Sequence, residues 1–295
     1  MKKTTILIPC YYGHIDHLFK TIDCFVKGTI KPYQILISLN GCKYINKTKI
    51  DKLQELYSKH FEHFDIIKSN EPMISPVARN FVYKYIKGDI ISLCDADDIQ
   101  HPQKVEIVEY FFNNYDIEHL MNGYILSECF KNNNNNHCFL CKNNYKRQFE
   151  KYYLENINFM DTKEVYNLNY FNDNIQPGVK TVLAFYNKNQ ILPTHGTCHF
   201  TKKVFDKIKF NELYPRGQDS LFCQEVLKTF KKTMIIDANL IIYVNGWVPQ
   251  KNDFYKFNSK YGDIYMNLGA PIPPPPGKPR DISEYTFIQN YLSSY

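Results

Sequence analysis

The sequence predicts an α/β protein with a mixed, mostly parallel central sheet flanked by helices. Four short apolar runs rich in β-branched residues alternate with segments whose apolar residues recur at helical spacing. The fourth run ends in the acidic loop Asp95–Asp98. The loops that follow parallel strands gather at one edge of the sheet, where open α/β sheets bind ligands. We therefore expect a ligand site at that edge.

The expected elements follow the chain in strand and helix pairs. Each strand is a run of apolar residues, and each helix has apolar residues three and four positions apart. In the first half we expect strands over 4–9, 34–39, 64–68 and 90–94, and helices over 15–27, 50–57, 76–88 and 103–113. The third helix should open at Pro76, close near Gly88 and turn Phe81, Val82, Tyr85 and Ile86 inward.

The pattern loosens after the fourth helix and returns near residue 180. Residues 131–176 are rich in Asn, Tyr and Lys and include five consecutive Asn, which is typical of an insertion. Beyond them we expect strands over 180–186 and 191–200, a helix over 202–208, a helix over 218–230 and one or two strands over 232–243. The stiff polyproline segment 271–279 leads to a tail that is either a loose terminus or an amphipathic helix.

The length and composition favour one large domain. The chain has 295 residues, of which 44% are hydrophobic, so it can bury a full core. We expect one domain over 1–270, made of a first half (1–115), a variable region (116–180) and a second half (181–250), followed by a Pro-rich tail over 271–295. The tail is a candidate for contact with a partner or for homo-oligomerisation.

The charge and the cysteines limit the partners and the compartment. The net charge of +6 comes from Lys and Arg spread along the chain, which favours an anionic small molecule over nucleic acid. Nine cysteines without secreted-domain spacing, and a start without a signal-peptide core, predict a reducing, cytoplasmic compartment. No apolar run is long enough for a transmembrane segment, although peripheral membrane contact stays possible.

One CxxC pair stands beside a histidine. Cys138 and Cys141 follow His137, but no second pair follows at the spacing of a zinc site. We interpret this pair as incidental.

The acidic loop carries the chemistry. Asp95, Asp97 and Asp98 place three carboxylates within four positions, which is costly unless a positive charge lies among them. A divalent cation that bridges the oxygens of a bound diphosphate would supply it. The alternative is a solvated acidic loop that caps the helix near Pro102.

Three separated blocks resemble the family 2 glycosyltransferases, which have the GT-A nucleotide-sugar-binding fold. The blocks are ILIPCYY at the first strand, ARNFVYKYIKGDIISLCDADD in the middle, and GTCHFTKKVFDKIKF followed by RGQDSLFCQEV near the end. The resemblance covers 4–113 well and 181–243 moderately, and it does not extend to the Asn-rich region or the tail. The middle block is the most specific, because an acidic triplet rarely follows Ala-Arg-Asn, a helix and an apolar strand by chance.

The resemblance implies a donor site in the first half. Pro9 and Tyr11 match the positions that hold the uracil ring, by backbone contact and by stacking. Asn40 matches a position where many members have an Asp that binds the base, so the identity of the base is less secure. Arg79 matches an arginine that approaches the nucleotide, and its alternative role is a surface salt bridge.

The resemblance also implies a metal. Asp95, Ala96 and Asp97 match the DxD motif of the family, in which the first carboxylate faces the ribose and the second binds Mn²⁺ or Mg²⁺ at the diphosphate. Asp98 would orient its neighbours or cap the helix. Many members carry a further metal-binding histidine after the last strand, but residues 243–253 contain none. Asn245 or Asp253 are possible substitutes.

In the second half the resemblance implies the acceptor side. Asp219 matches the catalytic base, with Gln218 where Glu is usual, and Asp219 is otherwise a capping acid favoured by the helix dipole. His195 and Gly196 match a loop near the acceptor, and His195 is equally a structural residue. Trp247 would stack on a sugar or fill the core.

Together these matches imply a metal-dependent transferase. It would move a sugar from a UDP-sugar donor to a hydroxyl of a glycan, protein or lipid, with inversion at the anomeric carbon. A sugar nucleotidyltransferase is one alternative, but it would need a Gly-rich loop that residues 10–14 do not supply. A non-catalytic nucleotide-sugar-binding scaffold is the other.

Overall fold

A computed structural model gives the fold of the chain. It describes residues 1–126, 151–167, 184–186, 189–191, 195–213 and 218–243. The CxxC pair, most of the Asn-rich region, Trp247, Asn245, Asp253 and the Pro-rich tail lie outside the described residues. Among the described helices, none has both the length and the apolar character needed to cross a bilayer.

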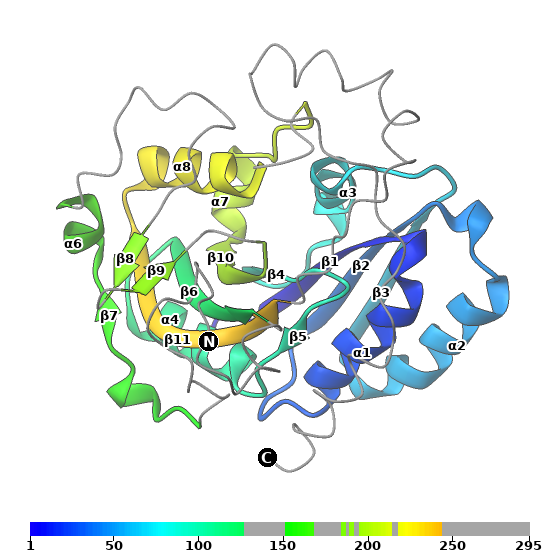
Figure 1. Cartoon of the computed structure of the whole chain (residues 1–295), viewed down its shortest axis with the longest axis horizontal. Helices are drawn as coiled ribbons and strands as arrows, with labels where there is room; N and C mark the ends of the chain where they lie inside the picture. The colour runs from blue at the N-terminus through cyan, green and yellow to red at the C-terminus, as the bar shows by residue number, and fades with distance from the viewer. Residues whose placement is uncertain (127–150, 168–183, 187–188, 192–194, 214–217, 244–295) are drawn as a thin grey trace, which may run out of the picture.

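The first half of the sheet is parallel, as the sequence predicts. Its order is β3-β2-β1-β4, and each neighbouring pair runs in the same direction (Figure 1). The strands are β1 Thr4–Tyr11, β2 Gln34–Asn40, β3 His63–Ser69 and β4 Ile90–Leu93. The chain therefore builds outward from β1 through β2 to β3 and then returns to the other side of β1. This return creates a topological switch point between β1 and β4.

The second half of the sheet mixes directions. Strand β10 (Cys198–Thr201) lies antiparallel between β4 and β6 (His119–Leu126), and β11 (Thr233–Tyr243) runs parallel to β6. The short strands β5 (Ile99–Gln100) and β7 (Phe159–Met160) pair antiparallel with β11. Strands β8 (Ala184–Tyr186) and β9 (Asn189–Ile191) form a separate two-stranded sheet. The mixed, mostly parallel sheet of the prediction is confirmed.

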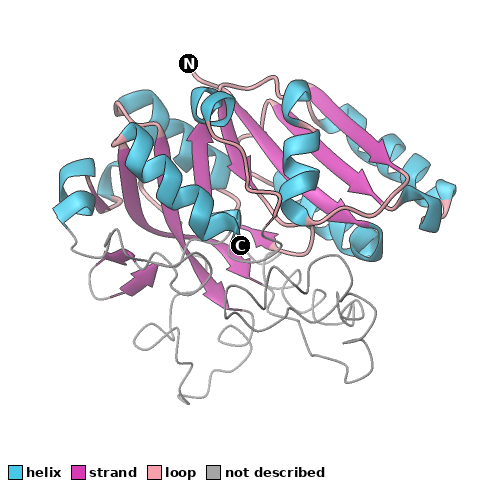
Figure 2. Ribbon diagram, turned by 90° about the horizontal axis from the view of Figure 1, so that it is seen from above, coloured by secondary structure: helices cyan, strands magenta, loops and turns pink. Residues whose placement is uncertain are grey.

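Helices cover both faces of the sheet (Figure 2). Helices α1 (Ile15–Val26), α2 (Lys47–Tyr57) and α4 (Lys104–Asn114) pack on one face. Helices α3 (Ser75–Phe81), α7 (Lys202–Lys207) and α8 (Gln218–Phe230) pack on the other, and α6 (Thr162–Asn167) lies at the β11 end. Strand alternation explains the two cores, because Ile6 and Ile8 join the α1 side while Leu7 joins the α3 side.

The expected third helix is shorter than its periodicity suggests. Helix α3 ends at Phe81, and a 3₁₀ turn over Tyr83–Tyr85 follows it. A 3₁₀ turn has about three residues per turn, so the expected spacing no longer holds beyond α3. Val82 and Ile86 are buried as expected, but Phe81 and Tyr85 are 40% and 37% exposed. The inward placement of these two aromatic residues is therefore wrong.

The expected strand over 191–200 is also interrupted. Strand β9 ends at Ile191, and a 3₁₀ turn over His195–Thr197 precedes β10. Gly196 lies against β11, where an added Cβ would stand 2.5 Å from Ile241 Cδ1. A larger residue there would have to displace this side-chain tip, and Gly196 lies in a turn and not in a strand interior.

The expected variable region contributes a central strand. Strand β6 lies between β10 and β11, and its apolar pattern is broken by the buried residues His119 and Asn122. Asn122 Oδ1 lies 2.6 Å from His199 Nε2, and Ser92 Oγ lies 2.8 Å from His199 Nδ1. This buried polar chain joins β4, β10 and β6. Because His119 and Asn122 interrupt the apolar pattern of β6, a prediction based on hydrophobicity does not recognise it as a core strand.

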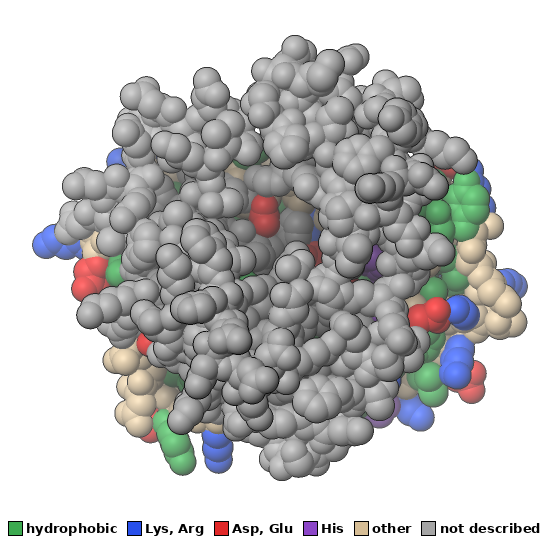
Figure 3. All heavy atoms as spheres, viewed as in Figure 1, with side chains coloured by type: hydrophobic (Ala, Val, Ile, Leu, Met, Phe, Trp, Pro, Cys, Tyr) green, Lys and Arg blue, Asp and Glu red, His purple; other side chains and the backbone are tan. Residues whose placement is uncertain are grey.

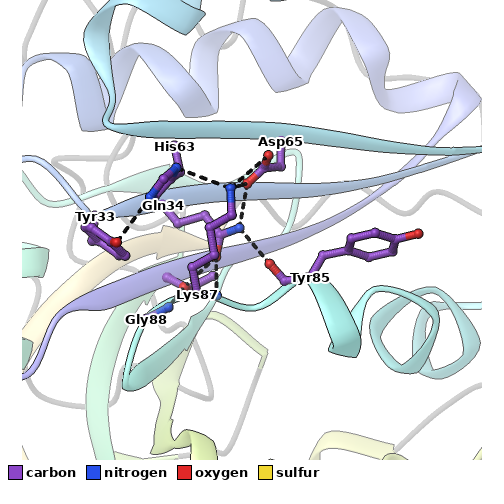
Figure 4. A network of polar contacts seen from close by, with 8 residues as sticks. Tyr33, Gln34, His63, Asp65, Tyr85, Lys87 and Gly88 are labelled. Atoms are coloured by element: carbon purple, nitrogen blue, oxygen red, sulfur yellow. Dashed lines mark hydrogen bonds and ion pairs between the residues drawn. The ribbon is translucent and has the colours of Figure 1, made fainter.

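Gln34 joins three elements at the amino end of the parallel strands (Figure 4). Its buried amide donates to Asp65 Oδ2 at 2.7 Å and to the carbonyl of Tyr85 at 2.8 Å. Its oxygen accepts from Thr5 Oγ1 at 2.8 Å and from the backbone N–H of Lys87 at 2.9 Å. Gln34 therefore satisfies its full hydrogen-bonding capacity and holds the chain that enters β4.

We expect Gln34→Met to destabilise the fold far more than Lys87→Met. The first change leaves buried groups without a partner, at about 1–3 kcal/mol for each. The second removes a half-exposed ion pair with Asp65 and an exposed contact with His63 Nδ1, and the ion pair is worth less than about 1 kcal/mol. Urea unfolding of both variants measures the difference. Equal losses would show that the buried amide does not carry this junction.

Candidate functional site

A cavity of about 300 Å³ opens at the carboxyl ends of β1, β2 and β4. It lies at the switch point between β1 and β4, where the strand order reverses. Six of the seven residues predicted for the donor site line it, together with four others. The lining residues are Pro9, Tyr11, His14, Asn40, Met73, Ser75, Ala78, Asp95, Ala96 and Asp97. On the face seen in Figure 3, acidic side chains are visible near the centre of the view.

The ring of Tyr11 lines one side of the cavity and begins a row of tyrosine rings, called here the tyrosine wall. The Tyr11 and Tyr12 ring centroids lie 4.0 Å apart, and Tyr12 continues to Tyr44 at 4.9 Å. Gly41 makes this row possible, because it has a φ of 73° and an added Cβ would stand 2.5 Å from Tyr12 Cδ1. Partial burial and the hydroxyl of Tyr12 raise the pKa of Tyr11, so its phenol stays neutral. The wall thus presents an uncharged ring to the cavity.

Asn40 is held by the backbone on both sides. Its Nδ2 donates to the carbonyl of Cys10 at 3.1 Å, and its Oδ1 accepts from the N–H of Met73 at 2.9 Å. An aspartate could not donate to the carbonyl of Cys10 and would place a charge against it. This geometry explains the amide in place of the acid. It also means that Asn40 joins β1, β2 and the loop before α3 at the cavity wall.

Each carboxylate of the acidic loop has a basic group of the protein nearby. Asp95 Oδ1 accepts from Arg79 Nη2 at 2.8 Å, and Asp97 Oδ2 lies 3.9 Å from His14 Nδ1. Lys104 is buried, and the charge of Asp98 raises its pKa against the stronger lowering by burial. These groups of the protein therefore offset part of the repulsion among the three carboxylates. The sequence alone had suggested that a metal ion must offset it.

Asp97 keeps a distinct environment within this loop. Its side chain is 34% exposed and lines the cavity. Partial burial raises the pKa of its carboxyl, the His14 ring lowers it, and the charge of Asp95 raises it again. The loop itself is held from α1, because Thr21 Oγ1 donates to the carbonyls of Ala96 and Asp98, both at 2.9 Å. Asp97 is thus presented to the cavity by a fixed backbone.

Arg79 lies under the cavity. It is fully buried, so it is not the surface ion pair considered from the sequence. Besides Asp95, its guanidinium donates to Ser75 Oγ and to Gln218 Oε1, the latter at 3.2 Å, and it lies 5.3 Å from the centroid of the Phe210 ring. Burial lowers the pKa of Arg79, and the charges of Asp95 and Asp219 oppose this. Contact between Arg79 and a nucleotide stays a prediction.

The first turn of α8 meets the donor side through Arg79. Gln218 is buried and accepts a hydrogen bond from the Arg79 guanidinium, and the next residue, Asp219, has a partly exposed side chain. The turn that contains His195 and Gly196 is tied to the acidic loop by Lys104, whose Nζ donates to the carbonyl of Gly196 at 3.0 Å and of Leu93 at 3.3 Å. The structure thus brings the two predicted halves of the site together.

Sequence reasoning missed two basic residues of the site. His14 follows the first strand in a loop that lacks a Gly-rich pattern, so only its distance to Asp97 identifies it. Lys104 stands in the first turn of α4, where a lysine is ordinarily solvated. Nothing in the local sequence marks its burial, because that depends on the contact between α4 and the turn at Gly196.

The chain matches the family model described as glycosyl transferase family 2 over residues 5–173, which is more than half of its length. An uncharacterized glycosyltransferase of Methanocaldococcus jannaschii is 21% identical over 252 residues, which cover 85% of this chain and 72% of that protein.

Solved structures share the fold. Residues 1–349 of S. aureus TarS, in complex with UDP-GlcNAc, have a TM-score of 0.58 at 11% identity, over 90% of this chain and 65% of that TarS chain. The chain therefore spans just under two thirds of this part of TarS. Glucosyl-3-phosphoglycerate synthase of Mycobacterium tuberculosis, with Mn²⁺, UDP and glucosyl-3-phosphoglycerate, has a TM-score of 0.51 at 9% identity, over 92% of this chain and 81% of the synthase. At identities this low, the structural similarity shows a common fold and nothing more.

We expect Arg79→Met to cost about 3–5 kcal/mol of stability, because it leaves Asp95 without its buried partner. Lys43→Met is the matched control, since Lys43 pairs with Glu71 on the surface and its loss should leave the stability nearly unchanged. Guanidinium unfolding measures both values. A loss below 1 kcal/mol in Arg79→Met would contradict a structural role for the guanidinium.

Proposed function

The chain belongs to glycosyl transferase family 2, and we propose that it transfers a sugar from a nucleoside diphosphate donor to a hydroxyl acceptor. The observation that carries this proposal is the cavity at the switch point, lined by Pro9, Tyr11, Asn40 and two carboxylates of the acidic loop. A ring wall opposite an acidic loop suits a ligand with a flat base at one end and a diphosphate at the other.

The proposed donor is a UDP-sugar. The tyrosine wall offers a ring face for the base, since base stacking on an aromatic side chain is worth about 1–3 kcal/mol. UDP is also the nucleotide named in the TarS and glucosyl-3-phosphoglycerate synthase complexes, two proteins of the same fold. Asn40 lines the same cavity, and beyond its contacts with Cys10 and Met73 its amide has one N–H and one lone pair left, which we propose for the base.

The acidic loop fits Mn²⁺ or Mg²⁺. Both ions prefer carboxylate oxygens, and Asp97 lines the cavity with a carboxylate that is not fully buried. Mn²⁺ is named in the synthase complex. We propose that Asp97 holds the ion, while Asp95 is held by Arg79 and faces the ribose. When bound, the cation would act as a Lewis acid on the leaving diphosphate.

Asp219 is the proposed base. It stands in the first turn of α8 beside Gln218, which Arg79 holds in place. Its carboxylate would take the proton of the acceptor hydroxyl, and attack from the side opposite the diphosphate would invert the anomeric carbon. We also propose that the turn of His195 and Gly196 lies on the acceptor side. The proposed acceptor is a hydroxyl of a glycan, protein or lipid.

We expect Asp97→Asn and Asp219→Asn to fail at different steps. Asp97→Asn removes a ligand charge, so Mn²⁺-dependent binding of UDP should weaken and UDP release from UDP-sugars should fall together with it. Asp219→Asn removes only the base, so UDP binding should persist while transfer falls by about 10²–10⁴-fold. Calorimetry with UDP and Mn²⁺, and UDP release over a panel of UDP-sugars and acceptors, measure the two steps.

The parent protein and a neutral surface variant complete this test. Asp51→Asn changes an exposed carboxylate of α2 and should alter neither step. Normal turnover in Asp219→Asn would show that Asp219 is not the catalytic base. UDP binding by the parent with no turnover of any donor would favour a non-catalytic nucleotide-sugar-binding protein.

Tyr11→Ala should weaken UDP binding by about 5- to 100-fold, because it removes the stacking surface. Tyr11→Phe keeps the ring and should bind UDP nearly as the parent does. Tyr44→Ala removes an outer ring of the same row, which is 58% exposed and does not line the cavity, and it should have little effect. Calorimetry measures the UDP affinity of each variant. Equal affinities in Tyr11→Ala and the parent would show that the base does not stack on Tyr11.

A further inference from the structure

We propose that His119, Cys198 and Cys223 form a zinc site behind the reaction site. All three side chains are buried, and their ligand atoms lie within 4.8 Å of one another. They come from β6, β10 and α8, so the ion would join two strands of the sheet to the helix that carries Asp219. The three residues of this cluster belong neither to the acidic loop nor to the CxxC pair of the sequence.

The distances suit a tetrahedral ion. Cys198 Sγ lies 3.2 Å from Cys223 Sγ, and Cys223 Sγ lies 3.8 Å from His119 Nε2. Zn–S bonds of about 2.3 Å and Zn–N bonds of about 2.0–2.1 Å place ligand atoms of one ion about 3.5–3.8 Å apart. Small shifts of the side chains would therefore complete the geometry.

A second contact orients the histidine. His119 Nδ1 lies 3.2 Å from Thr233 Oγ1, at the start of β11. When Nδ1 carries the proton and donates to this hydroxyl, the Nε2 lone pair faces the two sulfur atoms. Metal-binding histidines are oriented in this way, by a hydrogen bond from the nitrogen that does not bind the ion. The cluster thus has three candidate ligands and a hydroxyl group, that of Thr233, which orients the His119 ring.

Charge favours a divalent ion at this place. Two thiolates and one Zn²⁺ sum to zero, with a neutral imidazole as the third ligand, so the buried group would carry no net charge. A neutral group avoids most of the cost of burying a charge among apolar residues. Soft sulfur ligands also select zinc over the Mn²⁺ or Mg²⁺ proposed for the acidic loop. The two sites would therefore take different ions.

The zinc site would fix the position of α8. Cys223 follows Asp219 by four residues, which is about one helical turn. An ion held by Cys223 and by two strands would anchor this helix against the sheet and stabilise the folded state in proportion to its affinity. The link to the reaction rests on the proposed function of Asp219. The presence of zinc does not, so the two ideas can fail separately.

The test measures zinc in the full chain, purified with a reductant and reloaded with Zn²⁺. We expect one zinc ion per chain by elemental analysis, nine reduced thiols in denaturant, and a thiolate-to-cobalt charge-transfer band after exchange with Co²⁺. Cys198→Ser and Cys223→Ser should lose the zinc. Thr233→Val removes only the orienting hydroxyl and should weaken zinc binding by about 10- to 100-fold.

Two controls separate this site from other cysteines. Cys24→Ser changes a buried cysteine of α1, and the double variant Cys138→Ser with Cys141→Ser removes the CxxC pair. Both should keep the zinc and the cobalt band. The parent protein provides the decisive result even if a variant does not fold. Absence of zinc from the reloaded parent, seven thiols in place of nine, or loss of zinc only in the CxxC variant would each overturn the proposal.

Discussion

Arg79 donates from one buried guanidinium to Asp95, at the end of β4, and to Gln218, at the start of α8. A buried charge costs several kcal/mol unless it is paired and hydrogen-bonded, so this contact requires both partners to stay in place. The donor side and the acceptor side of the candidate site are therefore coupled through one side chain. Gln218 suits this arrangement, because its neutral oxygen accepts a hydrogen bond without adding a second negative charge beside Asp219.

The charges of the site follow from the same logic. Three carboxylates share a short loop, and the protein places Arg79, His14 and Lys104 at different sides of it. Groups of the protein itself therefore help to hold the loop in position. A cation at Asp97 would have to offset only the repulsion that these groups leave.

The centre of the sheet under this site is unusually polar. His199 joins β4 to β6 through Ser92 and Asn122, and Lys104 reaches the carbonyls of Leu93 and Gly196 from α4. Buried polar groups of this kind must be satisfied together, so they specify one register of the strands. Together with the proposed zinc cluster, they give the second half of the sheet a core based on directional contacts as well as on apolar packing.

The sequence by itself determined the first four strands, helices α1 and α2 and the place of the acidic loop, but it made the third helix too long. These features depend on local periodicity and on the rule that loops of parallel strands meet at one edge, and both can be read from neighbouring residues. It also identified six residues that line the cavity. Beyond residue 115 it placed α7 and α8 well, but its prediction for 191–200 missed the turn at His195–Thr197.

Only the tertiary structure decided which distant residues meet. The burial of Arg79 against Gln218, 139 positions later, the burial of Lys104 under Gly196 and the place of β6 in the middle of the sheet have no local signal. A lysine or a histidine has the same sequence context whether it is solvated or buried. Its state depends on which partners packing brings to it, and the free energy of burial is settled by those long-range contacts.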